Sequence, residues 1–347
     1  MSEIGAWLHI TDRCNIECNY CHFPHDPLDM PLEIALASIE TLFRVAKKYK
    51  TSSVYIKYMG GEPLIAFDKI VTISTHAKKL AQKSQIKLHE LIVSNGTILD
   101  IEKIKKIKEL KINLTISLDG LEQYNAQRVD ITSTKKVLNA ITLATKEGVY
   151  PNISIVVTKK NIDGLPSLIS WILEKKLRFT IILVRNHIFY QDELWEEKII
   201  NGLFKTFDEV EKNLPKESIV DSMFDMMNPL NPHTKTCGAG DNYLVFNPKG
   251  EIAKCQMDMK NPVATYQDQD PLKKIREDTK FVKSHNIDEI EECKECDIRY
   301  FCTSGCPMQT KYTTGLYKKK SPNCNIYKAI YPQLLKLEGL RMVKFGI

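Results

Sequence analysis

Three cysteines near the N-terminus are the residues of this sequence whose spacing most directly indicates chemistry. Cys14, Cys18 and Cys21 have the spacing CxxxCxxC. Three is an odd number and the loop is very short, so a disulfide framework does not explain them. Thiolates are soft ligands that select iron–sulfur clusters, zinc or copper(I), and a structural zinc site needs four ligands. Three thiolates can instead hold three irons of a [4Fe–4S] cluster and leave the fourth iron open.

The composition excludes several other classes of protein. The chain has 347 residues, of which 43% are hydrophobic, which is enough for a large core and two domains. It contains no apolar run of membrane-spanning length and no signal peptide, so we expect no membrane partner. Ten cysteines in such a chain indicate a reducing, cytoplasmic location and metal binding. The net charge of +6 is dispersed without an aromatic-interleaved basic stripe, which argues against nucleic acid.

Apolar runs rich in β-branched residues alternate with helical patterns in residues 1–215. The expected strands are Ala6–Ile10, Val54–Met59, Leu91–Ser94, Leu114–Ser117, Ile153–Val157 and Thr180–Val184, and the expected helices are Leu32–Ala46, Ile101–Leu110, Thr134–Thr145, Leu165–Glu174 and Glu193–Asn213. This alternation predicts βαβ units and a parallel sheet, with too few units for an eight-unit barrel. Residues 216–236 are expected to form a linker. Residues 237–347 hold the other seven cysteines in segments of little periodicity, which would need metal to fold stably.

The predicted strands end in polar or glycine-containing segments. The second strand runs into Gly60-Gly61-Glu62-Pro63, the third into Ser94-Asn95-Gly96-Thr97, and the fourth into Ser117-Leu118-Asp119-Gly120, with Arg128 further on. Successive glycines allow the backbone to approach a ligand closely. Plain strand-to-helix turns, one of them with Asp100 as a helix N-cap, would explain part of the same pattern.

Together with Tyr20 before the last cysteine, these segments resemble the motifs of radical S-adenosylmethionine (SAM) enzymes. The resemblance implies a partial (β/α)6 TIM-type barrel over residues 1–215 and a cluster whose open iron chelates SAM. It also implies reductive cleavage of SAM to a 5′-deoxyadenosyl radical. The SAM-binding residues that it implies are Tyr20, Gly60, Gly61, Glu62, Ser94, Asn95, Ser117, Arg128 and Val157. Among these, Arg128 would pair with the SAM carboxylate, while Asp119 would hold its loop or bind substrate.

The second set of cysteines follows a specific spacing of its own. It consists of Cys237, Gly250-x-x-x-x-Cys255, Cys293-x-x-Cys296, Cys302, Cys306 and Cys324. This arrangement resembles the SPASM domain, a C-terminal extension of radical SAM enzymes. The resemblance implies two auxiliary [4Fe–4S] clusters, one bound by Cys293, Cys296, Cys302 and Cys324 and the other by Cys237, Cys255 and Cys306. Two structural zinc sites built from CxxC pairs are the alternative.

The three-cysteine cluster leaves one iron without a cysteine ligand. That iron would be open to a substrate thiol, or closed by water or by Asp241. Sulfatase-maturing members of the family carry an additional cysteine in this region and an Asp directly after the equivalent of Cys255, where this chain has the neutral Gln256. The remaining candidate bases are Asp241 and His187, although a lone histidine after a strand is more often structural. Arg185 is a candidate for orienting a peptide carbonyl or carboxylate.

The sequence therefore predicts a cytoplasmic radical SAM oxidoreductase with three [4Fe–4S] clusters and SAM. Its expected substrate is a peptide or protein side chain, which it would oxidise or cross-link as a ribosomal peptide maturase. Its expected partners are a reductant such as flavodoxin or ferredoxin and, because only 13 residues precede Cys14, a separate leader-binding carrier protein or direct binding of the precursor to the barrel. The alternatives are a sulfatase-maturing enzyme, which Gln256 opposes, a small-molecule dehydrogenase, and an electron carrier, which would need no SAM-binding turn.

Overall fold

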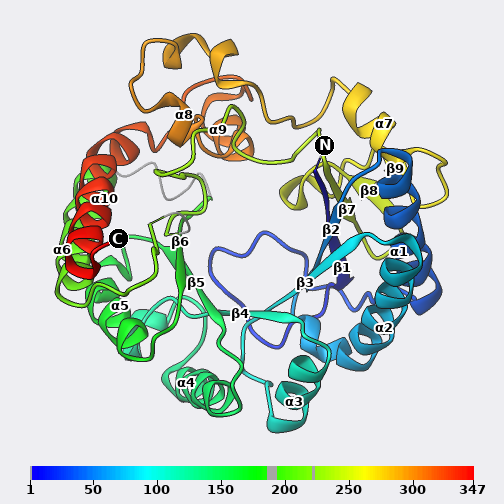
Figure 1. The fold of residues 1–347 in the computed structure, drawn as a ribbon, viewed down its shortest axis with the longest axis horizontal. Helices are drawn as coiled ribbons and strands as arrows, with labels where there is room; N and C mark the ends of the chain where they lie inside the picture. The colour runs from blue at the N-terminus through cyan, green and yellow to red at the C-terminus, as the bar shows by residue number, and fades with distance from the viewer. Residues whose placement is uncertain (1, 186–193, 221–222) are drawn as a thin grey trace.

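The computed structural model describes residues 2–185, 194–220 and 223–347, and its central element is a nine-stranded sheet. The strand order is β6-β5-β4-β3-β2-β1-β7-β8-β9. The strands are β1 (Glu3–Thr11), β2 (Ser53–Gly60), β3 (Lys87–Ser94), β4 (Asn113–Ser117), β5 (Asn152–Val157), β6 (Phe179–Leu183), β7 (Tyr243–Phe246), β8 (Glu251–Ala253) and β9 (Ala264–Thr265). Strands β1 to β6 pair in parallel, and the curved sheet is surrounded by helices (Figure 1). This confirms the predicted α/β class and is consistent with a partial TIM-type barrel.

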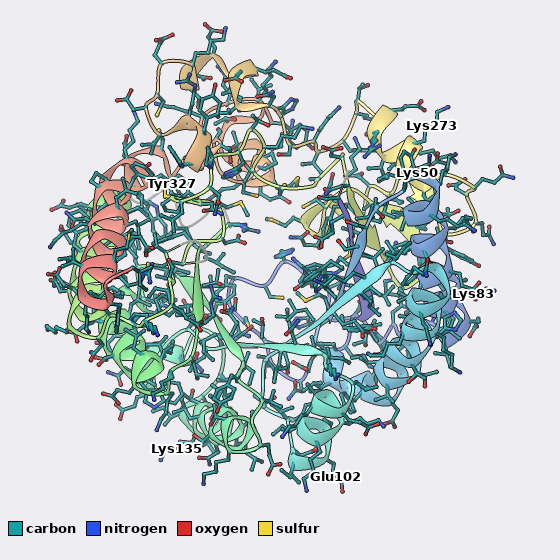
Figure 2. All side chains as sticks on the ribbon, viewed as in Figure 1. Lys50, Lys83, Glu102, Lys135, Lys273 and Tyr327 are labelled. Atoms are coloured by element: carbon teal, nitrogen blue, oxygen red, sulfur yellow. The ribbon has the colours of Figure 1, made fainter. Side chains whose placement is uncertain are left out.

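The helices of the described residues include an outer ring around the sheet (Figure 1). They are α1 (Leu32–Lys48), α2 (Phe67–Ser84), α3 (Ile101–Glu109), α4 (Ile131–Lys146), α5 (Leu165–Glu174), α6 (Trp195–Lys212), α7 (Pro271–Glu277), α8 (Arg299–Cys302), α9 (Pro307–Thr314) and α10 (Cys324–Phe345). Figure 2 shows Lys83, Glu102 and Lys135 on this outer ring. No helix in the described part of the chain combines the length and the apolar character needed to cross a membrane.

The two faces of the sheet differ because successive strand residues point in opposite directions. Ile4, Ala6 and Leu8 of β1 are fully buried in the main core that the helices cover. Trp7, which lies between Ala6 and Leu8, packs in a separate cluster that includes Met59 and Tyr243. We call this second side of β1, β2 and β7 the inner face, because it points away from the helices.

The sequence analysis missed α2, which follows directly on the Gly60-Gly61-Glu62-Pro63 segment. A short 3-10 turn, Pro63–Ala66, leads into this helix, and its buried face includes Ile70, Ile73 and Ala77. The β-branched residues at the start of α2 lower helix propensity, which obscured the helical spacing. The six predicted strands and the other helices of residues 1–215 are present within a few residues of their expected bounds.

The segment expected to be a linker packs against the barrel. Met223 and Phe224 are buried beside β6, where the Ile181 backbone N–H donates to the Met223 carbonyl at 2.7 Å. After this segment β7 joins the edge of the sheet in parallel with β1, and α10 runs beside α6 (Figure 1). Residues 237–347 thus extend the sheet of the first part, and their division into a domain of their own stays a prediction.

A buried carboxylate on β3 connects this strand to β2 and to α2. Glu90 on β3 accepts hydrogen bonds from the Tyr58 hydroxyl on β2 at 2.6 Å and from the Ser74 hydroxyl on α2 at 3.1 Å. Lys78 on α2 forms an ion pair with the same carboxylate. Because Tyr58 is fully buried, removal of Glu90 would take away the carboxylate that its hydroxyl bonds at 2.6 Å, with no solvent to replace it.

We therefore expect Glu90→Ala to lower the free energy of unfolding by about 3 kcal/mol, since it breaks a buried network that includes a charge pair. The measurement is the midpoint of urea denaturation followed by circular dichroism. Glu109→Ala is the matched control, because Glu109 pairs with Lys106 on the surface of α3. Equal midpoints for the two variants would contradict this account of Glu90.

Candidate functional site

The loop that carries Cys14, Cys18 and Cys21 follows β1 and is held by the end of β2. The Gly61 backbone N–H donates to the Thr11 carbonyl at 2.8 Å, and the Glu62 N–H donates to the Arg13 carbonyl at 2.9 Å. Gly60 has a φ of +154°, which a side chain would strain, and a Cβ atom at Gly61 would lie 2.4 Å from the Arg13 carbonyl oxygen. Both glycines therefore permit the contact that positions the start of the cysteine loop.

Glu62 joins this contact to the end of β3. Its carboxylate is fully buried and accepts hydrogen bonds from the Leu64 N–H at 3.0 Å, the Ser94 hydroxyl at 2.8 Å and the Asn95 N–H at 2.7 Å. Burial raises the pKa of Glu62, and these donors act in the opposite direction. Both carboxylate oxygens of Glu62 are thus engaged by the protein, so Glu62 acts by positioning the turns after β2 and β3.

The side chain of Asn95 reaches from the end of β3 to the cysteine loop. Its amide nitrogen lies 3.9 Å from the Cys14 sulfur and donates to the Asn15 side-chain oxygen at 2.9 Å. Ser117 and Val157 lie at the ends of β4 and β5. The sequence-predicted SAM residues thus come from the carboxyl ends of neighbouring parallel strands, the usual location of functional loops in barrels.

A buried network attaches the segment after β4 to the same loop. The Tyr20 hydroxyl donates to Asp119 Oδ2 at 2.5 Å, and Arg128 Nη1 lies 2.5 Å from the Tyr20 oxygen. Asp119 is fully buried and also accepts the Val156 N–H at 2.8 Å and a bond from Gln127 at 3.0 Å. Asp119 therefore holds its own loop, one of the two roles expected of it, while Arg128 directs its charge toward the cysteine loop.

The ten cysteines are free thiols, and they form three groups in space. Burial raises the pKa of two thiols in each group: Cys14 and Cys18 (Cys18 to about 11), Cys293 and Cys302 (Cys302 to about 12), and Cys237 and Cys255. The other members, Cys21, Cys296, Cys324 and Cys306, lie close enough to add to these shifts. Crowded, buried thiols of this kind become thiolates when a bound cation compensates their charge. The three donor sets therefore fit iron–sulfur clusters.

The four-cysteine group also surrounds a space of its own. Cys293, Cys296, Cys302 and Cys324 all line one small cavity together with Ser304. Within the described ranges, no three His, Cys, Asp or Glu side chains converge closely enough to hold a single metal ion.

The first and the three-cysteine groups lie toward opposite ends of β1. Strand β7 pairs in parallel with β1 from Gly5↔Tyr243 onward, and β8 returns antiparallel to β7. Cys237 before β7 and Cys255 after β8 are therefore level with the start of β1, whereas Cys14 follows its end. The stretch from Gly5 to Thr11 rises by roughly 20 Å at about 3.3 Å per residue.

The inner face between these two ends is lined by aromatic residues. Trp7, Phe23 and Tyr243 contribute to one cluster there, and the ring centroids of Trp7 and Phe23 are 5.8 Å apart. His9, fully buried on the same strand, lies 2.7 Å from Asp12 through its Nε2 atom. The sequence analysis did not single out these residues, although the alternation of Trp7 and His9 with aliphatic neighbours on β1 was the available signal.

The structure does not support Asp241 as a base or an iron ligand. Its carboxylate pairs with Lys235 at 2.8 Å and Arg276 at 3.4 Å, and the Lys235 hydrogen bond is the main cause of its lowered pKa. Two cations that hold a carboxylate make it a poor proton acceptor and occupy its oxygens. His187 lies outside the described residues. The Gln256 oxygen is 3.7 Å from the Cys255 sulfur.

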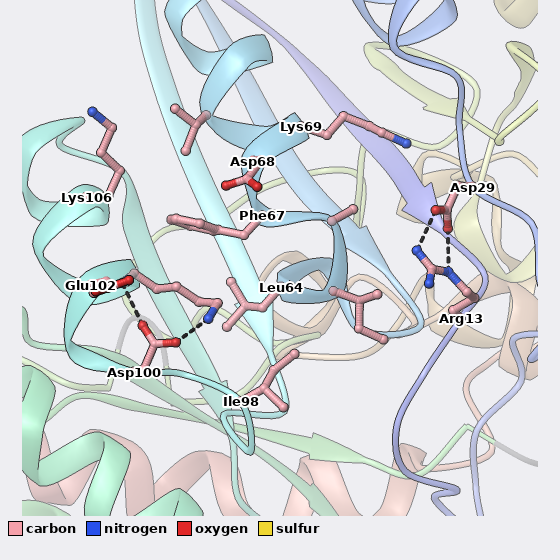
Figure 3. A pocket seen from close by; sticks show the side chains of 14 residues that line it. Arg13, Asp29, Leu64, Phe67, Asp68, Lys69, Ile98, Asp100, Glu102 and Lys106 are labelled. Atoms are coloured by element: carbon pink, nitrogen blue, oxygen red, sulfur yellow. Dashed lines mark hydrogen bonds and ion pairs between the residues drawn. The ribbon is translucent and has the colours of Figure 1, made fainter.

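A wide groove on the described part of the molecule is not the candidate site. It has a volume of about 810 Å³ and lies on the outside, between the start of α2 and α3 (Figure 3). Its lining includes the Arg13–Asp29 ion pair, with a nitrogen–oxygen distance of 2.5 Å, and the half-buried Lys106. None of the residues predicted to bind SAM or iron lines this groove, so we do not assign the proposed chemistry to it.

Known relatives extend over most of this chain. A radical SAM cyclopropyl synthase, TigE, of Paramaledivibacter caminithermalis is 21% identical over 95% of this chain and 74% of its own length. An uncharacterised protein of Methanocaldococcus jannaschii is 28% identical over 72% of this chain and 83% of its own length.

Solved structures of similar fold match nearly the whole chain. anSMEcpe with bound AdoMet has a TM-score of 0.77 at 20% identity and covers 98% of this chain and 99% of its own. Streptococcus suis SuiB bound to the precursor peptide SuiA has a TM-score of 0.63 at 17% identity, over 93% of this chain and 74% of its own. Residues 8–172 match the model of the Radical SAM superfamily. The part of the chain from residue 8 to residue 172 is therefore a radical SAM domain.

Proposed function

We propose that this enzyme oxidises or cross-links a side chain of a peptide or protein. One support is that two proteins of similar fold have been solved with peptides, namely SuiB with the precursor peptide SuiA and anSMEcpe with the Cp18Cys peptide. The observation that carries the proposal is the placement of two cysteine groups toward opposite ends of β1, with an aromatic inner face between them. A substrate on this face would have one cysteine group on either side.

In this proposal the chain's own residues bind the clusters and SAM, orient the substrate and shield the reacting carbon from water. Cys14, Cys18 and Cys21 hold the cluster that binds SAM, and the other seven cysteines hold two auxiliary clusters. When bound, these groups supply the electron that cleaves SAM and an acceptor for the electron that the substrate gives up. Arg128 offers a cation to the SAM carboxylate, the glycine turn after β2 offers backbone groups, and the inner face excludes water from the reacting carbon.

The proposal includes an external one-electron donor such as flavodoxin or ferredoxin, and a precursor that reaches the barrel directly or on a carrier protein. A sulfatase-maturing activity is less well supported, because Gln256 offers no proton acceptor beside Cys255. Small-molecule dehydrogenation is the remaining alternative, and it would require neither a peptide nor a carrier.

The test is an anaerobic assay of reconstituted enzyme with SAM, dithionite and peptides encoded beside its gene. A modified peptide should lose two hydrogens, seen by mass spectrometry, and deuterium from the labelled side chain should appear in 5′-deoxyadenosine. A two-hydrogen loss from a sugar or other small metabolite, with every peptide unchanged, would contradict the peptide proposal and leave the radical chemistry intact.

The iron content should follow the three cysteine groups. The reconstituted enzyme should hold roughly ten to twelve irons per chain, and replacing all cysteines of any one group by alanine should remove about four or fewer. The measurement is iron and sulfide per chain, with electron paramagnetic resonance of each variant. Stoichiometric zinc in place of iron would contradict the assignment.

Gly61→Ala should reduce iron in the N-terminal group as well as SAM affinity. The added Cβ would collide with the Arg13 carbonyl and displace the start of the cysteine loop. Gly339→Ala is the matched control, since nothing lies within 4 Å of a Cβ at this position on α10. Iron content and SAM affinity at the parent level in Gly61→Ala would show that the contact does not position the loop.

A further inference from the structure

Lys57 is a basic residue of the inner face to which the proposed chemistry gives no role. It lies on β2 opposite Trp7 of β1. Its neighbour Tyr58 points the other way, toward Glu90 and the helices, so Lys57 lies on the same side of the strand as Met59. The backbone of Lys57 is three residues from the glycine turn, roughly 10 Å along the strand.

Two tyrosine rings flank the ammonium group of Lys57. The Nζ atom is 5.6 Å from the centroid of the Tyr55 ring and 5.9 Å from that of Tyr243, which lies on β7. Gly5 on β1 pairs with Tyr55 on one side and with Tyr243 on the other, and a Cβ at Gly5 would lie 2.8 Å from the Tyr243 ring. The missing side chain at Gly5 therefore lets a ring from β7 approach a cation from β2, a cation–π arrangement.

The ammonium group has no carboxylate within ion-pair distance among the described residues. Other cations with little exposure do: Lys254 pairs with Asp278, Arg341 with Glu338, and Arg185 with Asp225. Burial lowers the pKa of Lys57, and Arg185 adds to this while Glu3 and Cys237 oppose it. Ring faces replace only part of the hydration that a partly buried ammonium loses, so an oxygen ligand would stabilise this ammonium group.

The charge balance of the inner face indicates the class of ligand. Arg185, the other cation that acts on Lys57, is already compensated by Asp225. Lys57 forms no ion pair with a described carboxylate, and its single positive charge matches the single negative charge of a carboxylate, which a phosphate dianion exceeds. The location, level with Trp7 and between the two cysteine groups, is where the proposed function requires substrate.

We propose that Lys57 binds a carboxylate of the substrate and thereby fixes its register on the inner face, with Tyr55 and Tyr243 as the walls of the subsite. This inference rests on the proposed function. For a peptide, the carboxylate belongs either to an acidic side chain or to the free C-terminus, and the chemistry recognised is the same.

The experiment measures binding and needs no turnover. N-acetylglutamate α-amide carries only the side-chain carboxylate, N-acetylglutamine carries only the terminal one, and N-acetylglutamine amide carries none. Isothermal titration or saturation-transfer NMR of the reconstituted enzyme should show one acid binding about tenfold more tightly than the neutral amide, as one charged hydrogen bond would give. The preferred acid identifies the source of the carboxylate.

Lys57→Met should abolish this preference, Lys57→Arg should retain most of it, and Lys135→Met, at an exposed position of α4, should leave it unchanged. Iron content and circular dichroism verify each variant, and Lys57→Gln replaces Lys57→Met if the latter fails to fold. Equal binding of acids and amide, or an undiminished preference without Lys57, would overturn the inference. Carboxylate binding without any peptide modification would instead overturn the proposed function alone.

Discussion

The backbone contact between the end of β2 and the first residues of the cysteine loop is the constraint on which the site depends. Two hydrogen bonds, from Gly61 to Thr11 and from Glu62 to Arg13, continue the β1–β2 pairing past the end of the strands. They require glycine at two successive positions, and they place Glu62 where its carboxylate organises the turn after β3. Hydrogen bonds thus join the cysteine loop, the glycine turn and the Asn95 turn. The same backbone contact therefore positions both the cluster ligands and the proposed SAM contacts.

The arrangement of the C-terminal cysteines has a second physical cause, the parallel pairing of β7 with β1. This pairing brings Cys237 and Cys255 to the end of the sheet edge opposite Cys14, and it adds Tyr243 to the inner face. The proposed division of labour follows from it: radical generation belongs to one end of the inner face and electron removal to the other. In this proposal the substrate lies along this face, where no carboxylate of the described residues pairs with Lys57.

Much of the fold and of the candidate site could be predicted from local sequence patterns. Apolar runs predicted the six strands of the barrel, and the cysteine and glycine spacings indicated radical SAM chemistry, because each of these motifs is contained within a few successive residues. Helix α2 was not predicted, because β-branched residues such as Ile70 and Ile73 weaken a helical pattern. Local patterns do not encode the pairing of Gly5 with Tyr243, the two cations on Asp241 or the position of Lys57 beside Tyr243, because these contacts join residues far apart in the chain.

The most direct measurement of the central claim is the formation of 5′-deoxyadenosine from SAM by the anaerobically reconstituted enzyme with dithionite, compared with the Cys14→Ala/Cys18→Ala/Cys21→Ala variant. The account predicts product with the parent enzyme and none with the variant, which keeps the iron held by its other seven cysteines. Continued cleavage of SAM by the variant, or no cleavage by the fully loaded parent enzyme, would contradict it.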